Sequence, residues 1–163
     1  MKVPYTNFRI SLNNEWSERD TVDIFEKKKV VVFAVPGAFT PSSGSQQLVG
    51  YEKNYDSFKK LGVEEVYCLS VNDTFVMNAW FKEWNIVNVK PIGDGEGVFT
   101  QGMGMLVNKP KQGFGMRSWR YSMLVDNGEV VKVFEEPGKN NASDDDDPFK
   151  VSDANTMKNF LEK

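Results

Sequence analysis

The chain has 163 residues, of which 40% are hydrophobic and 13% aromatic, a composition typical of one folded domain spanning residues 1–163. Its 20 Lys and Arg residues nearly balance 23 Asp and Glu residues, and the net charge of −3 gives no electrostatic reason to expect a nucleic acid or an anionic membrane as partner. There is no His, and Cys68 is the only Cys. This excludes an internal disulfide and a Ser-His-Asp hydrolase, argues against a structural zinc site, and leads us to expect no metal or cofactor.

The apolar runs of the sequence are short. The run over residues 30–35 has the length of a strand and is far too short to span a bilayer, and residues 1–10 contain no apolar signal core. We therefore predict a cytoplasmic protein, or one of an organellar matrix if a transit peptide has been removed.

The first half of the chain alternates predicted strands and helices. Residues 29–35 form a continuous apolar, β-branched run that predicts a central strand buried on both faces, and residues 65–71 predict a second. Between them, apolar residues at helical spacing predict a helix from Ser43 to about Leu61. Asn72 and Asp73 are expected to cap the next helix, whose apolar stripe is formed by Phe75, Val76, Ala79 and Trp80.

The second half predicts a short strand, a hairpin and a final helix. The strand covers residues 89–92, and the hairpin joins residues 120–126 to residues 129–134 through Asn-Gly. Residues 138–148 are polar and predict a mobile loop, after which Ser152 is expected to cap the last helix. This order predicts an α/β fold with a central mixed sheet flanked by helices on both faces.

The segment over residues 36–47 joins a predicted buried strand to an amphipathic helix. In open α/β sheets, sites gather beyond the carboxyl ends of strands, and the first turn of a helix favours a negative group. A cysteine at position 43 would have its thiolate stabilised there, with the Thr40 hydroxyl nearby. From these residues alone, a capped loop with two prolines and no chemistry remains the alternative.

Several motifs resemble those of the peroxiredoxins, specifically the atypical type II group that includes bacterial peroxiredoxin-glutaredoxin hybrids. Residues 36–44 read Pro-Gly-Ala-Phe-Thr-Pro-Ser-Ser-Gly, whereas the family pattern is Pro-Gly-Ala-Phe-Thr-Pro-Thr-Cys-Ser. The stretches 70–80, 102–105, 117–125 and 147–154 also match, and the likeness runs from about Pro4 to the C-terminus. The resemblance implies a thioredoxin-like fold with the elaborations of peroxiredoxins.

The resemblance also implies a function and a site. The family reduces hydrogen peroxide and small alkyl hydroperoxides with a cysteine thiolate, which becomes a sulfenic acid. By resemblance, Thr40 would hold the peroxide, Arg120 would stabilise the thiolate and the leaving oxygen, and Pro36 would shield position 43 from water. A thiol reductant, either glutathione with glutaredoxin or thioredoxin, and a homodimer are implied as partners.

Ser43 stands where the family has its reactive cysteine. A hydroxyl is far less acidic than a thiol, no His can take its proton, and oxygen cannot follow the oxidation steps of sulfur, so the chain as written should not turn over peroxide. An engineered exchange and natural divergence are both open, because Pro36, Thr40 and Arg120 are retained whereas Gly44 and Val49 depart from the family's Ser and Pro. A non-catalytic binding or regulatory module is the alternative function.

Other chemically suggestive residues have simpler interpretations. Cys68 lies within an apolar strand and is expected to be a buried structural thiol. Arg117 is either a supporting charge or a solvated side chain. The aromatic-rich side chains of the helix after Asp73 are expected to be core, and a share in a dimer contact together with Phe39 and Pro41 is the sharper alternative. These side chains are Phe75, Met77, Trp80 and Phe81. The acidic run 144–147 is expected to be a solvated loop without calcium.

Overall fold

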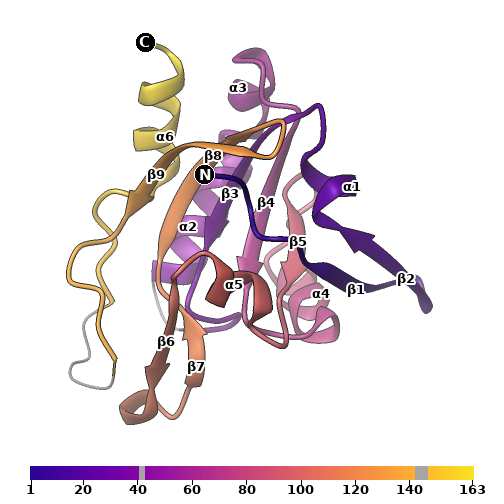
Figure 1. The fold of residues 1–163 in the computed structure, drawn as a ribbon, viewed down its shortest axis with the longest axis vertical. Coiled ribbons are helices and arrows are strands. Elements are labelled where there is room, and N and C mark those ends of the chain that lie inside the picture. Colours follow the sequence, from indigo (N-terminus) through magenta and orange to yellow (C-terminus); the bar gives the residue numbers. More distant parts are fainter. Residues whose placement is uncertain (41–42, 142–146) are drawn as a thin grey trace.

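The computed structural model describes residues 1–40, 43–141 and 147–163, with the backbone alone for Ser43 and Gly44. Its centre is a five-stranded sheet in the order β5-β4-β3-β8-β9 (Figure 1). β3, β4 and β5 are parallel, whereas β8 is antiparallel to β3 and to β9. The mixed sheet predicted from the sequence is therefore confirmed. The strands are β3 (Lys29–Ala34), β4 (Glu65–Ser70), β5 (Lys90–Gly93), β8 (Tyr121–Asp126) and β9 (Glu129–Glu135).

Alternate residues of β3 belong to two separate cores, because successive side chains of a strand point to opposite faces of the sheet. Val30 and Val32 pack in one core, and Val31 and Phe33 pack in the other. All four are fully buried. This explains why the strand reads as a continuous apolar run rather than as an alternating one.

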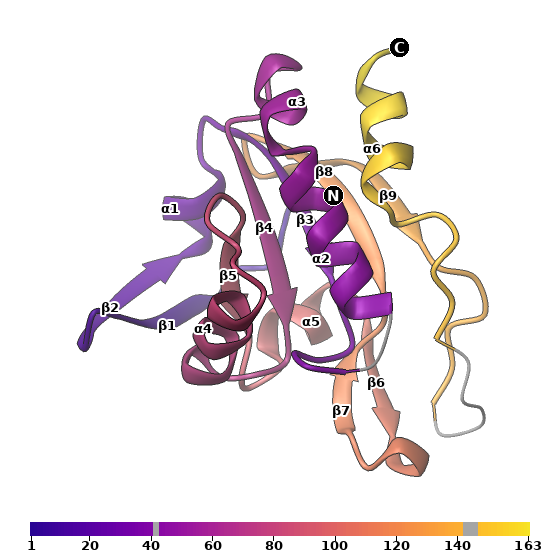
Figure 2. The same cartoon turned by 180° about the vertical axis from the view of Figure 1, so that it is seen from behind.

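Helices cover both faces of the sheet (Figures 1 and 2). One face carries α2 (Ser43–Lys53), α3 (Tyr55–Lys60), α4 (Thr74–Glu83) and α6 (Ala154–Leu161). The other carries α1 (Thr21–Phe25), α5 (Val98–Gly102) and the hairpin of β1 (Asn7–Leu12) and β2 (Glu15–Asp20). A second hairpin, β6 (Leu106–Lys109) and β7 (Gly115–Ser118) around the 3₁₀ turn η1 (Pro110–Gln112), extends from one end. Within the described ranges, no helix is long and apolar enough to cross a membrane.

Local details differ from the prediction at two helices. The single helix expected from Ser43 to Leu61 is divided at Asn54, whose side-chain amide donates to the Gly50 carbonyl oxygen at 2.8 Å. This bond follows from the tendency of Asn to compete for backbone groups. The last helix is capped by Asp153 and not by Ser152, which is buried and bonded elsewhere. The two flanking hairpins, β1–β2 and β6–β7, were not predicted.

Of two smaller expectations, one is confirmed in full and the other in part. Asn127 and Gly128 both have positive φ, 50° and 78°, as a tight hairpin turn requires. The apolar stripe predicted for α4 is only partly right, because Val76 is half-buried and Ala79 is exposed. The core position expected for the aromatic-rich side chains of this helix is confirmed for Met77, Trp80 and Phe81, which are buried. Phe75 is the exception, because its ring is exposed and packs edge-on against Trp16 at 5.3 Å between centroids.

Candidate functional site

The loop that follows β3 is held by side-chain hydrogen bonds. The Thr40 hydroxyl donates to the Gly37 carbonyl oxygen at 2.8 Å. The Asn72 side-chain oxygen, which lies just beyond β4, accepts from the Ala38 amide at 2.9 Å and from the Ser70 hydroxyl at 2.6 Å. The loop is thus tied to the end of the neighbouring parallel strand, where sites of α/β sheets lie.

Arg117 packs under this loop. Its Nη1 donates to the Pro36 carbonyl oxygen at 3.3 Å, and its Nε donates to the Phe114 carbonyl oxygen at 3.1 Å. A Cβ on Gly37 would lie 2.3 Å from Nη1, so only glycine permits this approach. Burial lowers the pKa of the guanidinium from its usual value. Of the two open interpretations, the supporting one is favoured, since Arg117 holds the loop and is not simply solvated.

Arg120 is buried beside the first turns of α2, with 1% of its surface exposed. Its Nη1 donates to the side-chain oxygen of Gln47 at 2.7 Å. Gln47 lies in α2, one helical turn after position 43. The Nε and Nη2 atoms of Arg120 donate to the Asp147 carboxylate at 3.1, 2.8 and 2.7 Å. The Phe149 ring centroid lies 5.6 Å from Cζ. Both ends of the guanidinium are therefore fixed by partners.

Behind Gln47 lies a buried polar network that fixes the direction of its amide. Gln47 Nε2 donates to the Ser152 carbonyl and hydroxyl oxygens at 3.1 and 3.3 Å, which leaves Oε1 facing Arg120. The Glu136 carboxylate, fully buried, accepts from the Ser152 hydroxyl and from the amides of residues 150–152 at 2.7–2.9 Å. The loop before α6 is thereby anchored to the residue that directly follows β9, whose own amide donates to the Arg120 carbonyl oxygen at 3.1 Å.

The structure describes three of the four predicted site residues in full and the fourth by its backbone alone. Pro36 and Thr40 lie on the loop that leads into α2, and Arg120 lies against α2 itself, although no hydrogen bond joins Thr40 to Arg120 among the described residues. Ser43 begins α2, but its side chain, like Pro41 of the predicted dimer contact, lies outside the described residues. The quartet of Pro36, Thr40, position 43 and Arg120 thus remains a prediction at its central member.

Sequence reasoning missed three side chains of this region. Gln47, Asn72 and Asp147 were given no role in the site. Asn72 was expected to cap α4, but Asp73 alone is the cap, and the Asn72 side chain holds the Thr40 loop instead. The spacing of four residues from position 43 could have indicated Gln47. Asp144 to Asp146 lie outside the described residues, but the expectation that Asp147 is merely solvated is wrong, because it forms a bidentate ion pair with Arg120.

Cys68 is fully buried in β4. Burial raises the pKa of its thiol well above the usual value, and the charge of Arg120 acts in the opposite direction. A protonated, enclosed thiol is a poor nucleophile, in keeping with the structural role expected from its position in an apolar strand.

A groove of about 780 Å³ opens beside the start of α2. Its walls include the exposed rings of Phe39 and Trp84 together with Thr40 and Val49. Phe39 has a positive φ of 63°, which is uncommon for a residue other than glycine, and its side chain is exposed. The groove gives access to the loop that carries Thr40.

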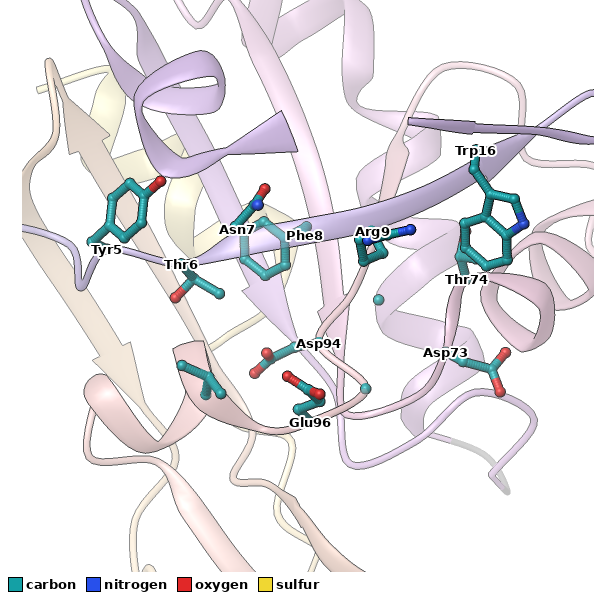
Figure 3. Close-up of a pocket in the computed structure, with 13 residues that line it drawn as sticks. Tyr5, Thr6, Asn7, Phe8, Arg9, Trp16, Asp73, Thr74, Asp94 and Glu96 are labelled. Atoms are coloured by element: carbon teal, nitrogen blue, oxygen red, sulfur yellow. The ribbon is translucent and has the colours of Figure 1, made fainter. Parts of the chain in front are cut away.

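A second cavity, of about 390 Å³, lies between β1 and the loop from β5 to α5 (Figure 3). Asp94 and Glu96 lie side by side in it, below the Phe8 ring. The Asp94 carboxylate accepts hydrogen bonds from the amides of Phe99 and Thr100, and Asp73 caps α4. None of the lining residues belongs to the Thr40 loop or to α2. This cavity therefore contributes nothing to the arrangement around Arg120.

Comparisons with known proteins identify the family. The Redoxin family matches residues 1–157. Peroxiredoxin y4vD of Sinorhizobium fredii is 46% identical over 96% of this chain and 88% of its own length. The chain belongs to the peroxiredoxins. It is also 51% identical to hybrid peroxiredoxin hyPrx5 of Haemophilus influenzae, over 98% of this chain but only 64% of that protein, so the chain spans less than two thirds of that relative.

Solved peroxiredoxin structures share the fold closely. A crystallised peroxiredoxin is 36% identical with a TM-score of 0.93, covering 99% of this chain and 96% of its own. Prx3 of Vibrio vulnificus, solved in complex with H₂O₂, is 34% identical with a TM-score of 0.88 over 99% and 96%. The thioredoxin-like architecture expected from the resemblance is confirmed, and the family is one of thiol peroxidases that use a peroxide and a thiol reductant.

Proposed function

We propose that this chain carries the peroxide pocket of a thiol peroxidase and that, with Ser43 at the reactive position, it binds peroxide without turning it over. The site consists of Pro36, Thr40, Arg120 and the group at position 43. The observation that carries this proposal is the fully buried Arg120 held against α2 by Gln47 at 2.7 Å.

The pocket offers a suitable set of polar groups for a peroxide. The Thr40 hydroxyl donates its hydrogen to the Gly37 carbonyl oxygen, so its lone pairs can accept a hydrogen bond from a peroxide O–H. Arg120 supplies a positive charge in a buried place, where charge stabilisation is strong. The first turn of α2 adds free backbone N–H groups at position 43.

The chemistry needs a thiolate at position 43. In the Ser43→Cys variant, the thiolate attacks one peroxide oxygen, the O–O bond breaks, and the second oxygen leaves as water or an alcohol after taking a proton. The sulfur becomes a sulfenic acid, which one thiol converts to a mixed disulfide with loss of water and a second thiol returns to the free thiol. Ser43 can do none of this, because its hydroxyl stays protonated and no His is present to activate it.

The partners of this reaction are proposed by chemistry and family. A small hydroperoxide is the substrate, and glutathione with glutaredoxin or thioredoxin is the reductant, in a cytoplasmic or organellar-matrix compartment. The resemblance to the peroxiredoxin-glutaredoxin hybrids favours the glutaredoxin route. The aromatic groove of Phe39 and Trp84 is our candidate for the homodimer surface, since exposed aromatic side chains are enriched at interfaces.

A second candidate function follows from Ser43 itself. If the source gene encodes serine at this position, the retained pocket serves a binding or regulatory module that lacks turnover. Sequencing of the source gene decides between this and an engineered exchange.

Peroxide consumption with excess dithiothreitol tests the proposal on three proteins. They are the chain as written, Ser43→Cys, and Ser45→Cys as a matched control with a thiol two residues further along the same helix. We expect consumption by Ser43→Cys alone. Equal consumption by both thiol variants, or by neither, would contradict the proposed site, and turnover by the unchanged chain would make Cys68 the nucleophile.

A further inference from the structure

The Nε and Nη2 edge of Arg120 is occupied by a carboxylate from a distant loop. Asp147 accepts from both nitrogens at 2.7–3.1 Å, and its side chain is 39% exposed whereas that of Arg120 is 1% exposed. Bidentate pairs of this kind fix the plane of a guanidinium as well as its position. The rotation of Arg120 is therefore set by Asp147 from one side and by Gln47 from the other.

This pair also changes the charge that Arg120 presents. A carboxylate in direct contact cancels much of the field of the guanidinium at nearby points. Solvent reduces this effect in part, because the Asp147 side chain is 39% exposed whereas Arg120 is buried. Because Gln47 stands one helical turn beyond position 43, the guanidinium lies beside the first turns of α2. The net field at that helix start therefore depends on Asp147 as well as on Arg120.

Other charged and titratable groups near Arg120 are engaged elsewhere. Glu136 is saturated by the amides of residues 150–152 and the Ser152 hydroxyl. Asp153 caps α6, and Arg117 holds the Pro36 carbonyl oxygen. Cys68 remains protonated in its apolar strand. Within the part of the chain that the structure describes, Asp147 is thus the carboxylate in direct contact with the guanidinium.

We propose that Asp147 is a positioning residue that orients Arg120 and moderates its charge, and so sets how strongly Arg120 stabilises an anion at position 43. This inference rests on the proposed function, because it assumes that the group at position 43 reacts as an anion. Asp147 belongs to the segment that precedes α6, so the acidity of the site is controlled by a loop far from it in sequence.

The test measures the acidity of a thiol at position 43 and needs no peroxide. In the Ser43→Cys background, Asp147→Asn removes the negative charge but keeps a hydrogen-bond acceptor for Nε and Nη2. The rate of alkylation by iodoacetamide is measured from pH 4 to pH 10, and the unchanged chain, with Cys68 alone, supplies the background. We expect Asp147→Asn to lower the pKa of the position-43 thiol by about half to one unit, which is about a three- to tenfold larger thiolate fraction below the pKa.

Two matched variants control for general effects. Asp126→Asn removes an exposed carboxylate at the opposite end of β8, about 20 Å along the strand, and should leave the pKa unchanged. Asp147→Glu keeps the charge and should shift the pKa by less than half as much as Asp147→Asn does. An unchanged or raised pKa in Asp147→Asn, with a normal melting transition, would overturn the inference. If Asp147→Asn fails to melt cooperatively, Asp147→Glu decides the test. A change of half a unit or more in the pKa of the position-43 thiol in Asp147→Glu, with no change in Asp126→Asn, would also overturn the inference.

The inference and the proposed function fail in different experiments. If Ser43→Cys consumes no peroxide but Asp147→Asn still lowers the pKa of its thiol, the proposed function is wrong and the role of Asp147 is supported. If Ser43→Cys consumes peroxide and Asp147→Asn leaves the pKa of its thiol unchanged, the proposed function is supported and this inference is wrong.

Discussion

The side-chain oxygen of Gln47 accepts from Arg120 Nη1 at 2.7 Å, while the amide nitrogen of the same side chain donates to Ser152. One side chain of α2 thus connects the buried arginine to the loop before α6. Because each end of the amide has a fixed partner, its two orientations are not equivalent.

Replacing Gln47 with Leu should lower the free energy of unfolding by about 1–3 kcal/mol, since Arg120 and Ser152 both lose a buried partner. Urea denaturation of this variant is compared with that of Gln46→Leu, which changes the exposed neighbour on the same helix and should have little effect. Equal losses for the two variants would contradict the network.

Replacing Glu136 with Gln should cost about 2–4 kcal/mol of stability. Its buried carboxylate accepts four hydrogen bonds, and an amide nitrogen would face donors where oxygen now accepts. Glu135→Gln, at the exposed neighbour, is the control and should lie within about 0.5 kcal/mol of the parent. Denaturation midpoints that do not separate the two variants would show that the anchor is dispensable.

Gly37→Ala should disturb the Thr40 loop. The new Cβ would lie 2.3 Å from Arg117 Nη1 and 2.9 Å from Thr40 Cγ2, so a loss of about 1–3 kcal/mol is expected, together with slower peroxide consumption in the Ser43→Cys background. Gly50→Ala, within α2, meets only Ala154 Cβ at 3.9 Å and should be neutral or stabilising, because alanine favours a helix. Thermal melting of both variants checks the contrast.

Stability should fall at alkaline pH. Burial raises the pKa of Cys68 above 9.0 and the pKa values of Tyr51 and Tyr121 above 10.0, so the folded state keeps protons that the unfolded chain releases. The contribution of each group is fully present below its unfolded pKa and is lost as pH rises above that value, by about 1.4 kcal/mol per pH unit. Urea unfolding from pH 7 to pH 11 measures this slope. In Cys68→Ala the slope between pH 9 and pH 10 should become shallower, and an identical slope would contradict the assignment.

The sequence predicted those parts of the fold that depend on local pattern. The apolar run of β3 and the Asn127-Gly128 turn were both recognisable, because burial on two faces and positive φ leave direct signatures. The hairpin β1–β2 was missed because much of β2 is exposed and carries no apolar alternation.

The candidate site was predicted unevenly for a similar reason. Pro36, Thr40 and Arg120 come from a motif, whereas Asp147 reaches Arg120 only through the tertiary fold, across 27 residues. No periodicity in a polar, acidic segment indicates which carboxylate turns inward. The break at Asn54 was also hidden, since the apolar spacing of Tyr51 and Phe58 continues across it.

The central claim is that the pocket around Thr40 and Arg120 is a peroxidase site that lacks only its thiol. The most direct measurement is the second-order rate constant for oxidation of the Ser43→Cys variant by hydrogen peroxide, followed by stopped-flow tryptophan fluorescence and by loss of the free thiol. We predict a rate constant at least about 100-fold above that of the Ser45→Cys thiol under the same conditions, because preorganised donors act on the leaving oxygen at position 43 alone. Equal rate constants for the two thiols would contradict the claim.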